Sequence, residues 1–222
     1  VHLAICGFLI SIVLGIPLGI MSAVKRDSFL DKLTKGFAVF GLAAPQFWVA
    51  IMLILFLGGQ LQWFPTYGRG DIEGWWPEWH QIPQTLWHLA LPSTVLALSV
   101  TAAIMRLARS AMLEILDSDY VKCAQVKGLS NRLVIWRHAA KNALIPVLTF
   151  GGITLAGLLN GSVVVEVVFA WPGVGLLLLD GVTQRDFPLT EAAILLSGFF
   201  YITTAVLIDI AYGWVDPRVR VR

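Results

Sequence analysis

Five long apolar runs, separated by short clusters of charged residues, are the feature that most constrains the fold of this chain. A helix needs about 20 mostly apolar residues to cross roughly 30 Å of hydrocarbon. The runs meet that length and cover approximately residues 3–24, 37–57, 86–107, 143–165 and 190–214. Only 14% of the residues are charged, whereas soluble domains carry about 25%. The sequence therefore predicts an all-α integral membrane protein, a polytopic helical bundle with five spans.

The placement of the basic residues predicts how the chain is oriented. Of the 16 Lys and Arg residues, only Arg69 and Arg185 follow the second and fourth runs, and the others lie at the end of, or after, the first, third and fifth. Cytoplasmic loops carry an excess of Lys and Arg. We therefore expect a multi-pass protein of the bacterial inner membrane, with Val1 outside and Arg222 in the cytoplasm.

The loop between the third and fourth runs predicts two helices separated by a stop. Gly128 suits the left-handed conformation that ends many helices, and Ser130 is a favourable N-cap for the helix that follows. Pro146 is expected in the first turn of the fourth span, where its missing N–H group costs little.

The second helix of this loop is predicted to be short, basic and amphipathic. Its apolar positions recur at helical spacing and therefore share one face. They are Leu129, Leu133, Trp136 and Ala140. Such a helix could lie on anionic lipid or dock into a cytoplasmic partner, and its composition is compatible with both.

The segment after the fourth run is predicted to form an irregular outer mouth. The sequence from Phe169 to Gly175 breaks the helix, and the apolar run at 176–182 is too short to span. Irregular backbone at membrane depth is tolerated only against protein or a water-filled cavity. The candidate pathway or gate residues are Asn160, Ser162, Glu166, Phe169, Trp171, Pro172 and Gly173. Asn160 and Ser162 could equally hold two helices together, and Glu166 could serve in gating or in pairing.

Small and aromatic residues add two further predictions. Gly15 with Gly19, and Gly157 with Gly161, are spaced for close helix packing. The segment from Gly58 to Trp87 is rich in tryptophan and is expected along the outer membrane surface. A sugar-binding platform would use the same aromatic residues.

Three motifs, in the same order, resemble the permease subunits of bacterial ABC importers of the dipeptide, oligopeptide and nickel branch. The first resembles the EAA loop of these permeases and comprises Asp119-Tyr120, Ala124, Lys127-Gly128-Leu129-Ser130, Arg137-His138-Ala139 and Asn142–Pro146. The other two are Glu166–Gly175 and Asp216–Arg220. The resemblance covers nearly the whole chain. It departs from the general pattern at Lys122 and Cys123, where Glu and Ala are usual.

This resemblance implies a type I ABC importer permease fold. Residues 1–222 would be a single transmembrane permease domain that lacks a sixth span at its N-terminus, and residues 119–146 would be the coupling loop. The residues expected to couple to an ATPase are Ala124, Lys127, Gly128, Leu129, Leu133, Trp136, Arg137, His138, Asn142 and Pro146.

The resemblance also implies partners and a substrate class. The expected partners are a second homologous permease, two ATP-binding-cassette ATPase subunits and a periplasmic substrate-binding protein, with membrane lipid around the spans and no nucleic acid. The substrate would be a peptide, or nickel and related small solutes, moved from the periplasm to the cytoplasm. Because the chain has no G-x-x-x-x-G-K loop, we expect no catalytic residue and no bound metal or cofactor, and ATP and Mg²⁺ on the partner ATPases.

An ion-coupled secondary transporter or channel is the alternative interpretation. Such a protein would carry a charge near the membrane centre, and often inverted repeats. The sequence shows neither feature. A membrane-bound enzyme would carry paired acids or histidines at one membrane face, and those are also lacking.

Overall fold

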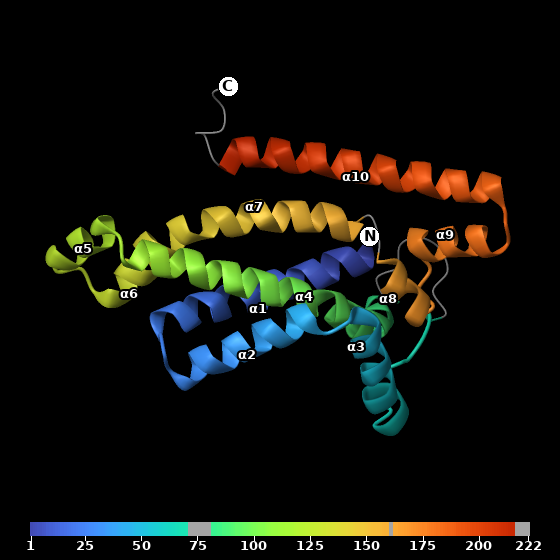
Figure 1. Ribbon diagram of the computed structural model, residues 1–222, viewed down its shortest axis with the longest axis horizontal. Coiled ribbons are helices and arrows are strands. Elements are labelled where there is room, and N and C mark those ends of the chain that lie inside the picture. The colour runs from blue at the N-terminus through green and yellow to red at the C-terminus, as the bar shows by residue number, and fades with distance from the viewer. Residues whose placement is uncertain (71–80, 160–161, 216–222) are drawn as a thin grey trace. The chain divides into compact units, whose positions relative to one another are not determined.

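The computed structural model describes residues 1–70, 81–159 and 162–215, and every regular element in them is helical (Figure 1). The α-helices are α1 (His2–Val24), α2 (Phe29–Ala43), α3 (Gln46–Leu53), α4 (Ile82–Leu116), α5 (Asp119–Val126), α6 (Asn131–Leu133), α7 (Ala140–Leu159), α8 (Val163–Val168), α9 (Val174–Thr183) and α10 (Phe187–Val215). The π-helices are η1 (Ile54–Gln60) and η3 (Val134–Ala139). This confirms the predicted all-α fold.

Four helical segments among the described residues are long and apolar enough to span a membrane. They are His2–Val24, Ile82–Leu116, Asn131–Leu159 and Phe187–Leu207. The span expected at residues 37–57 is interrupted, because α2 ends at Ala43 and α3 begins at Gln46. Pro45 lacks an N–H group and disfavours helical geometry at the residue before it. The pair formed by α2 and α3–η1 gives a fifth span only as a broken one.

The helix of the fourth span begins much earlier than the sequence predicts. It runs without interruption from Asn131 to Leu159, so Pro146 lies in its interior, inside α7. The expectation that Pro146 occupies the first turn of this span is therefore wrong. The apolar run marks where the span becomes hydrophobic, whereas the helix itself begins in the polar loop before it.

The chain packs as two compact units. The first, which we call the outer unit, comprises Val1–Phe8, Ala44–Ala97 and Ile153–Arg222, and the second, the inner unit, comprises Leu9–Ala43 and Leu98–Gly152. The names refer to the predicted sides of the membrane on which their loops lie. The inner unit contains α2 and the loop between α4 and α7, and the outer unit contains α3, α8, α9 and α10.

Glycines hold α1 and α2 close to α4 in the inner unit. A Cβ atom at Gly15 would lie 2.9 Å from Ile104 Cγ2, and one at Gly19 would lie 2.8 Å from Ala108 Cβ. On α2, a Cβ at Gly41 would lie 2.8 Å from Ala102 Cβ. The predicted packing role of Gly15 and Gly19 is confirmed. A Cβ at Gly157 would meet open space within this chain, and Gly161 lies outside the described residues, so the packing role of this pair stays a prediction.

A buried carboxylate on α2 joins three helices of the inner unit. Asp31 is fully buried. Its Oδ1 accepts hydrogen bonds from Arg109 Nε of α4 at 2.7 Å and from Ser22 Oγ of α1 at 2.6 Å. Its Oδ2 accepts from Arg109 Nη2 at 3.1 Å and pairs with Lys35 Nζ at 2.8 Å. A buried charge is tolerated when it is paired and hydrogen-bonded in this way.

The two faces of α2 have the polarity expected of a helix in lipid. Its buried stripe consists of small and polar residues, namely Asp31, Thr34, Ala38 and Gly41. Its other side exposes the large apolar residues Leu33, Phe37, Val39, Phe40 and Leu42. In water this pattern would be inverted. The helix therefore supports the interpretation of the chain as a membrane protein.

The outer unit is built around short helices packed against a long one. Helix α9 packs along α10, and α8 contacts both α3 and α9; Figure 1 shows α9 and α10 as neighbours. Trp63, Tyr67 and Trp87 of the aromatic segment are exposed, and Phe64 stacks on Trp87 with ring centroids 4.8 Å apart. The remaining tryptophans predicted for the surface belt, Trp75, Trp76 and Trp79, lie outside the described residues.

Candidate functional site

Helix α5, the first helix of the loop at residues 119–146, ends in the motif that the sequence predicts. Gly128 has a φ of +76°. Its N–H donates to Gln125 O at 2.9 Å, and the N–H of Leu129 donates to Ala124 O at 3.4 Å. These two bonds form a Schellman motif. A Cβ at Gly128 would meet open space, so glycine is required by the backbone conformation rather than by crowding.

The helix after this stop differs from the one predicted. Ser130 occupies the N-cap position with an extended backbone, but its side chain makes no capping hydrogen bond. Helix α6 then continues through η3 into α7. The predicted short helix is therefore the first part of a long one, which makes the loop a rigid extension of the fourth span.

The π-helix η3 changes which residues of this helix are buried. Val134 and Ala139, five residues apart, are 1% and 0% exposed, whereas Trp136 is 52% exposed. A π-turn holds more residues than an α-turn, so the apolar face no longer follows α-helical spacing. The predicted face of Leu129, Leu133, Trp136 and Ala140 is wrong, because only Ala140 is fully buried.

A hydrophobic cluster fixes the loop to the ends of two spans. It joins residues from four parts of the inner unit: Ile20 and Ala23 of α1, Ala111 and Met112 of α4, Val121 and Ala124 of α5, and Val134, Ala139, Ala140 and Ala143 of η3 and α7. Packed interiors have low compressibility and transmit strain. A force on α5 or η3 would therefore act on α1 and α4 as well.

The outward side of the same loop is apolar and basic. Tyr120, Val126 and Trp136 are 52%, 88% and 52% exposed, and the predicted coupling residues Lys127 and Arg137 are exposed beside them. Figure 1 shows α5 and α6 together at the end of α4. Exposed aromatic and apolar side chains among cations are typical of a protein interface.

One hydrogen bond connects α5 to the helix that follows it, and a second lies within that helix. Tyr120 Oη lies 2.7 Å from His138 Nδ1, and Asn142 Nδ2 donates to His138 O at 3.3 Å. The structure thus brings His138 and Asn142 together with Tyr120, a residue of the first motif. Pro146 is exposed one turn further along α7.

The break after α8 folds around the side chain of Glu166. This residue is 7% exposed, and its Oε2 accepts a hydrogen bond at 3.1 Å from the N–H of Leu176, the third residue of α9. A Cβ added at Gly173 would overlap the Glu166 carboxyl group. Burial raises the pKa of this carboxyl above its ordinary value. Glu166 therefore caps the N-terminus of α9 from a distance in the sequence.

The remaining residues of the predicted gate occupy mixed positions. Phe169 and Trp171 are buried, at 1% and 5% exposure, and Phe169 O accepts a hydrogen bond from the Gly68 N–H at 2.7 Å. Ser162 is at the N-cap of α8 without a side-chain capping bond, and Pro172 is exposed. Asn160 lies outside the described residues. A role for these residues in a pathway stays a prediction.

Sequence reasoning missed the buried charge cluster around Asp31. A signal was present, because Asp31, Thr34, Ala38 and Gly41 recur at helical spacing as a small and polar stripe. That stripe indicates a buried face only if α2 is assumed to lie in lipid, where small and polar residues face other helices.

Comparison with known proteins gives three consistent results. The family model described as "Binding-protein-dependent transport system inner membrane component" matches residues 15–221. A Brucella abortus protein named as a peptide transport system permease is 39% identical over 99% of this chain and 68% of its own length. The dipeptide transport system permease protein DppB of Escherichia coli K12 is 35% identical over 99% of this chain and 70% of its own length.

A solved structure supports the same fold. A chain of the MetNI methionine ABC transporter, in an inward-facing conformation, aligns with a TM-score of 0.73 and 15% sequence identity, covering 97% of this chain and 92% of that one. The helical architecture, the ordered motifs and the family match agree. The chain therefore belongs to the family of binding-protein-dependent transport system inner membrane components, the permease subunits of ABC importers.

Proposed function

We propose that this permease moves peptides from the periplasm to the cytoplasm. Its similarity to proteins named as peptide and dipeptide permeases extends over 99% of the chain. Nickel and related small solutes are the other substrates of the branch that the motifs resemble. A periplasmic substrate-binding protein would deliver the substrate to the outer break around Glu166, and a second homologous permease would complete the pathway.

The loop at residues 119–146 is the proposed contact with two ATPase subunits. The observation that carries this proposal is the loop's two-sided construction: Val126 and Trp136 are exposed, while Val121 and Ala139 are fully buried against α1 and α4. One side is available to a partner, and the other is joined to the spans.

Transport would follow from movement of this loop. Closure of the ATPases around ATP and Mg²⁺ would displace α5 and η3, and the hydrophobic cluster would pass that displacement to α1 and α4 as a rigid-body movement. The chain itself contributes no catalytic residue in this scheme. The single permease domain would lie with its C-terminus and this loop in the cytoplasm.

An ion-coupled secondary transporter is supported less well. Asp31 is the buried charge that such a carrier would use, but Arg109 and Lys35 already neutralise it. A carboxylate held by two cations is a poor carrier for a proton, because its charged form is strongly favoured.

Affinity purification of the full-length subunit in mild detergent, followed by mass spectrometry, tests the proposal. We expect two ATPase chains and a second permease to co-purify. Val126→Asp should release the ATPases, because it places a charge in the docking surface. Phe29→Asp is the matched control, since Phe29 is 81% exposed and is the first residue of α2, outside the loop. A wild-type subunit that purifies alone would favour the secondary transporter.

A further inference from the structure

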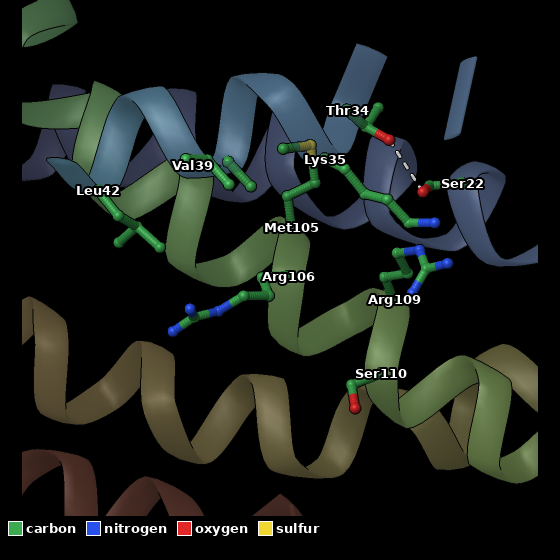
Figure 2. Close-up of a pocket in the computed structure, with 10 residues that line it drawn as sticks. Ser22, Thr34, Lys35, Val39, Leu42, Met105, Arg106, Arg109 and Ser110 are labelled. Carbon is green, nitrogen blue, oxygen red and sulfur yellow. Dashed lines mark hydrogen bonds between the residues drawn. The ribbon is translucent and has the colours of Figure 1, made fainter. Parts of the chain in front are cut away.

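A pocket of about 280 Å³ lies between α2 and α4 in the inner unit (Figure 2). Three cationic side chains line it, namely Lys35, Arg106 and Arg109, together with the apolar residues Val39, Leu42 and Met105. The described residues that line it include no carboxylate. This pocket has no part in the proposed contact with the ATPases.

The pocket retains positive charge after its internal pairing is satisfied. Lys35 and Arg109 both bind Asp31, which lies behind the lining residues. Arg106 is exposed and makes no ion pair with any part of the chain that the structure describes. Two cations thus share one carboxylate while a third is unpaired, which makes the pocket electropositive and suited to an anion.

The apolar wall of the pocket continues into an exposed apolar face. Val39 is 70% exposed and Leu42 is 41% exposed. Figure 2 shows both on α2, with the Arg106 side chain extending on their side of the pocket and Lys35 and Arg109 converging near Ser22. A ligand in this pocket would therefore meet charge at one end and hydrocarbon-like surface at the other.

The position of the pocket along the spans matches the level of lipid headgroups. Lys35 directly precedes the apolar run at residues 37–57, and Arg106 lies at the end of the run at residues 86–107. Val39 is one helical turn from Lys35, toward the hydrocarbon. Basic pockets between helices on the cytoplasmic side are a recognised type of site for anionic lipid headgroups.

We propose that this pocket binds the phosphate headgroup of an anionic phospholipid, with an acyl chain lying along Val39 and Leu42. Charge complementarity and the continuous apolar face favour a lipid over a protein segment, and the volume is too small for a helix. Assignment to the inner leaflet rests on the orientation proposed above, whereas the binding itself does not.

Native mass spectrometry of the purified transporter tests this proposal. The complex is titrated with phosphatidylglycerol or with phosphatidylcholine, and the lipid-bound fraction is measured. We expect Arg106→Gln to weaken phosphatidylglycerol binding about fivefold, the contribution of one basic side chain at an anionic surface. Lys32→Gln is the matched control, because Lys32 is exposed on α2, the helix that carries Lys35, and does not line the pocket. Equal loss in both variants, or in neither, would overturn the proposal.

A second variant separates a built pocket from general attraction to charge. Val39→Trp keeps every cation but fills the apolar wall, so it should also weaken phosphatidylglycerol binding; unchanged binding would contradict the proposal. A photo-crosslinking residue at position 39 should form lipid adducts in native membranes. Adducts with another protein chain instead would overturn the assignment. Neither the lipid-bound fraction nor the crosslinking depends on transport. The lipid-binding proposal can therefore fail while the proposed peptide transport stands.

Discussion

At the scale of single residues, Asp31 has the largest effect on the inner unit. Its carboxylate receives bonds from Ser22, Lys35 and Arg109, which come from three helices. None of these four residues was a candidate from the sequence, because each is common near the inner ends of spans. Their importance comes from being brought together, which depends on helix packing and not on local sequence.

Replacing the buried carboxylate should destabilise the protein strongly. We expect Asp31→Asn to lower the free energy of unfolding by about 3 kcal/mol, because it leaves the Arg109 guanidinium without its anion. Thermal unfolding in detergent measures this change. Asp27→Asn is the control, since the Asp27 side chain is 79% exposed. A wild-type melting temperature for Asp31→Asn would show that the cluster does not hold the helices together.

Gly128 offers a second test at this scale, directed at coupling. Valine is strained at a positive φ, whereas asparagine adopts this conformation readily. We expect Gly128→Val to reduce peptide uptake per ATP hydrolysed in proteoliposomes, and Gly128→Asn to behave like wild type. If both variants lose coupling equally, the side chain disturbs the partner surface, and the left-handed stop is not the cause.

At the scale of elements, local composition predicts the spans better than it predicts the loop. The apolar runs correspond to α1, α4, α7 and α10, because the length needed to cross hydrocarbon depends only on the sequence of each segment. The Gly128 stop was predicted for the same reason. The face of the second loop helix was predicted wrongly, because η3 is stabilised by burial of Val134 and Ala139 against other helices.

The glycine contacts between α1 and α4 give a prediction at the element scale. Gly19→Ala should destabilise the protein by about 1–3 kcal/mol, because the new methyl group meets Ala108 and the backbone of α4. Gly36→Ala adds the same group to α2, where a Cβ meets open space. That control should leave the melting temperature unchanged or raise it slightly. Equal destabilisation by Gly19→Ala and Gly36→Ala would contradict the role of Gly19 in packing α1 against α4.

At the scale of the whole molecule, the sequence indicated the class of protein and the position in the chain of the loop at residues 119–146. Charge placement and apolar length are properties of the entire chain. Predictions from them do not change when the boundary of a span is misplaced by a few residues. The packing that joins the loop to the spans could not be predicted. It depends on the cluster that joins Ile20 to Met112 and Val121, because Ile20 is distant from both in the sequence and all three are ordinary apolar residues.

The orientation of the whole chain can be tested with a native side chain. Cys123 is exposed on α5, which we place in the cytoplasm. In a full-length subunit with Cys123 as its sole cysteine, a membrane-impermeant maleimide should label inside-out vesicles and leave intact spheroplasts unlabelled. Detergent-permeabilised spheroplasts, in which Cys123 should be labelled, control for access of the reagent. Labelling of Cys123 from outside would reverse the proposed topology.

The pairing of Asp31 with Arg109 can form only after both residues have been synthesised. The two residues are 78 positions apart, so at about 5–20 residues per second the ribosome needs roughly 4–16 s to make the second after the first. During that interval α2 carries a carboxylate whose partner on α4 does not yet exist. We therefore expect α1 and α2 to reach their final packing only after α4 has been synthesised.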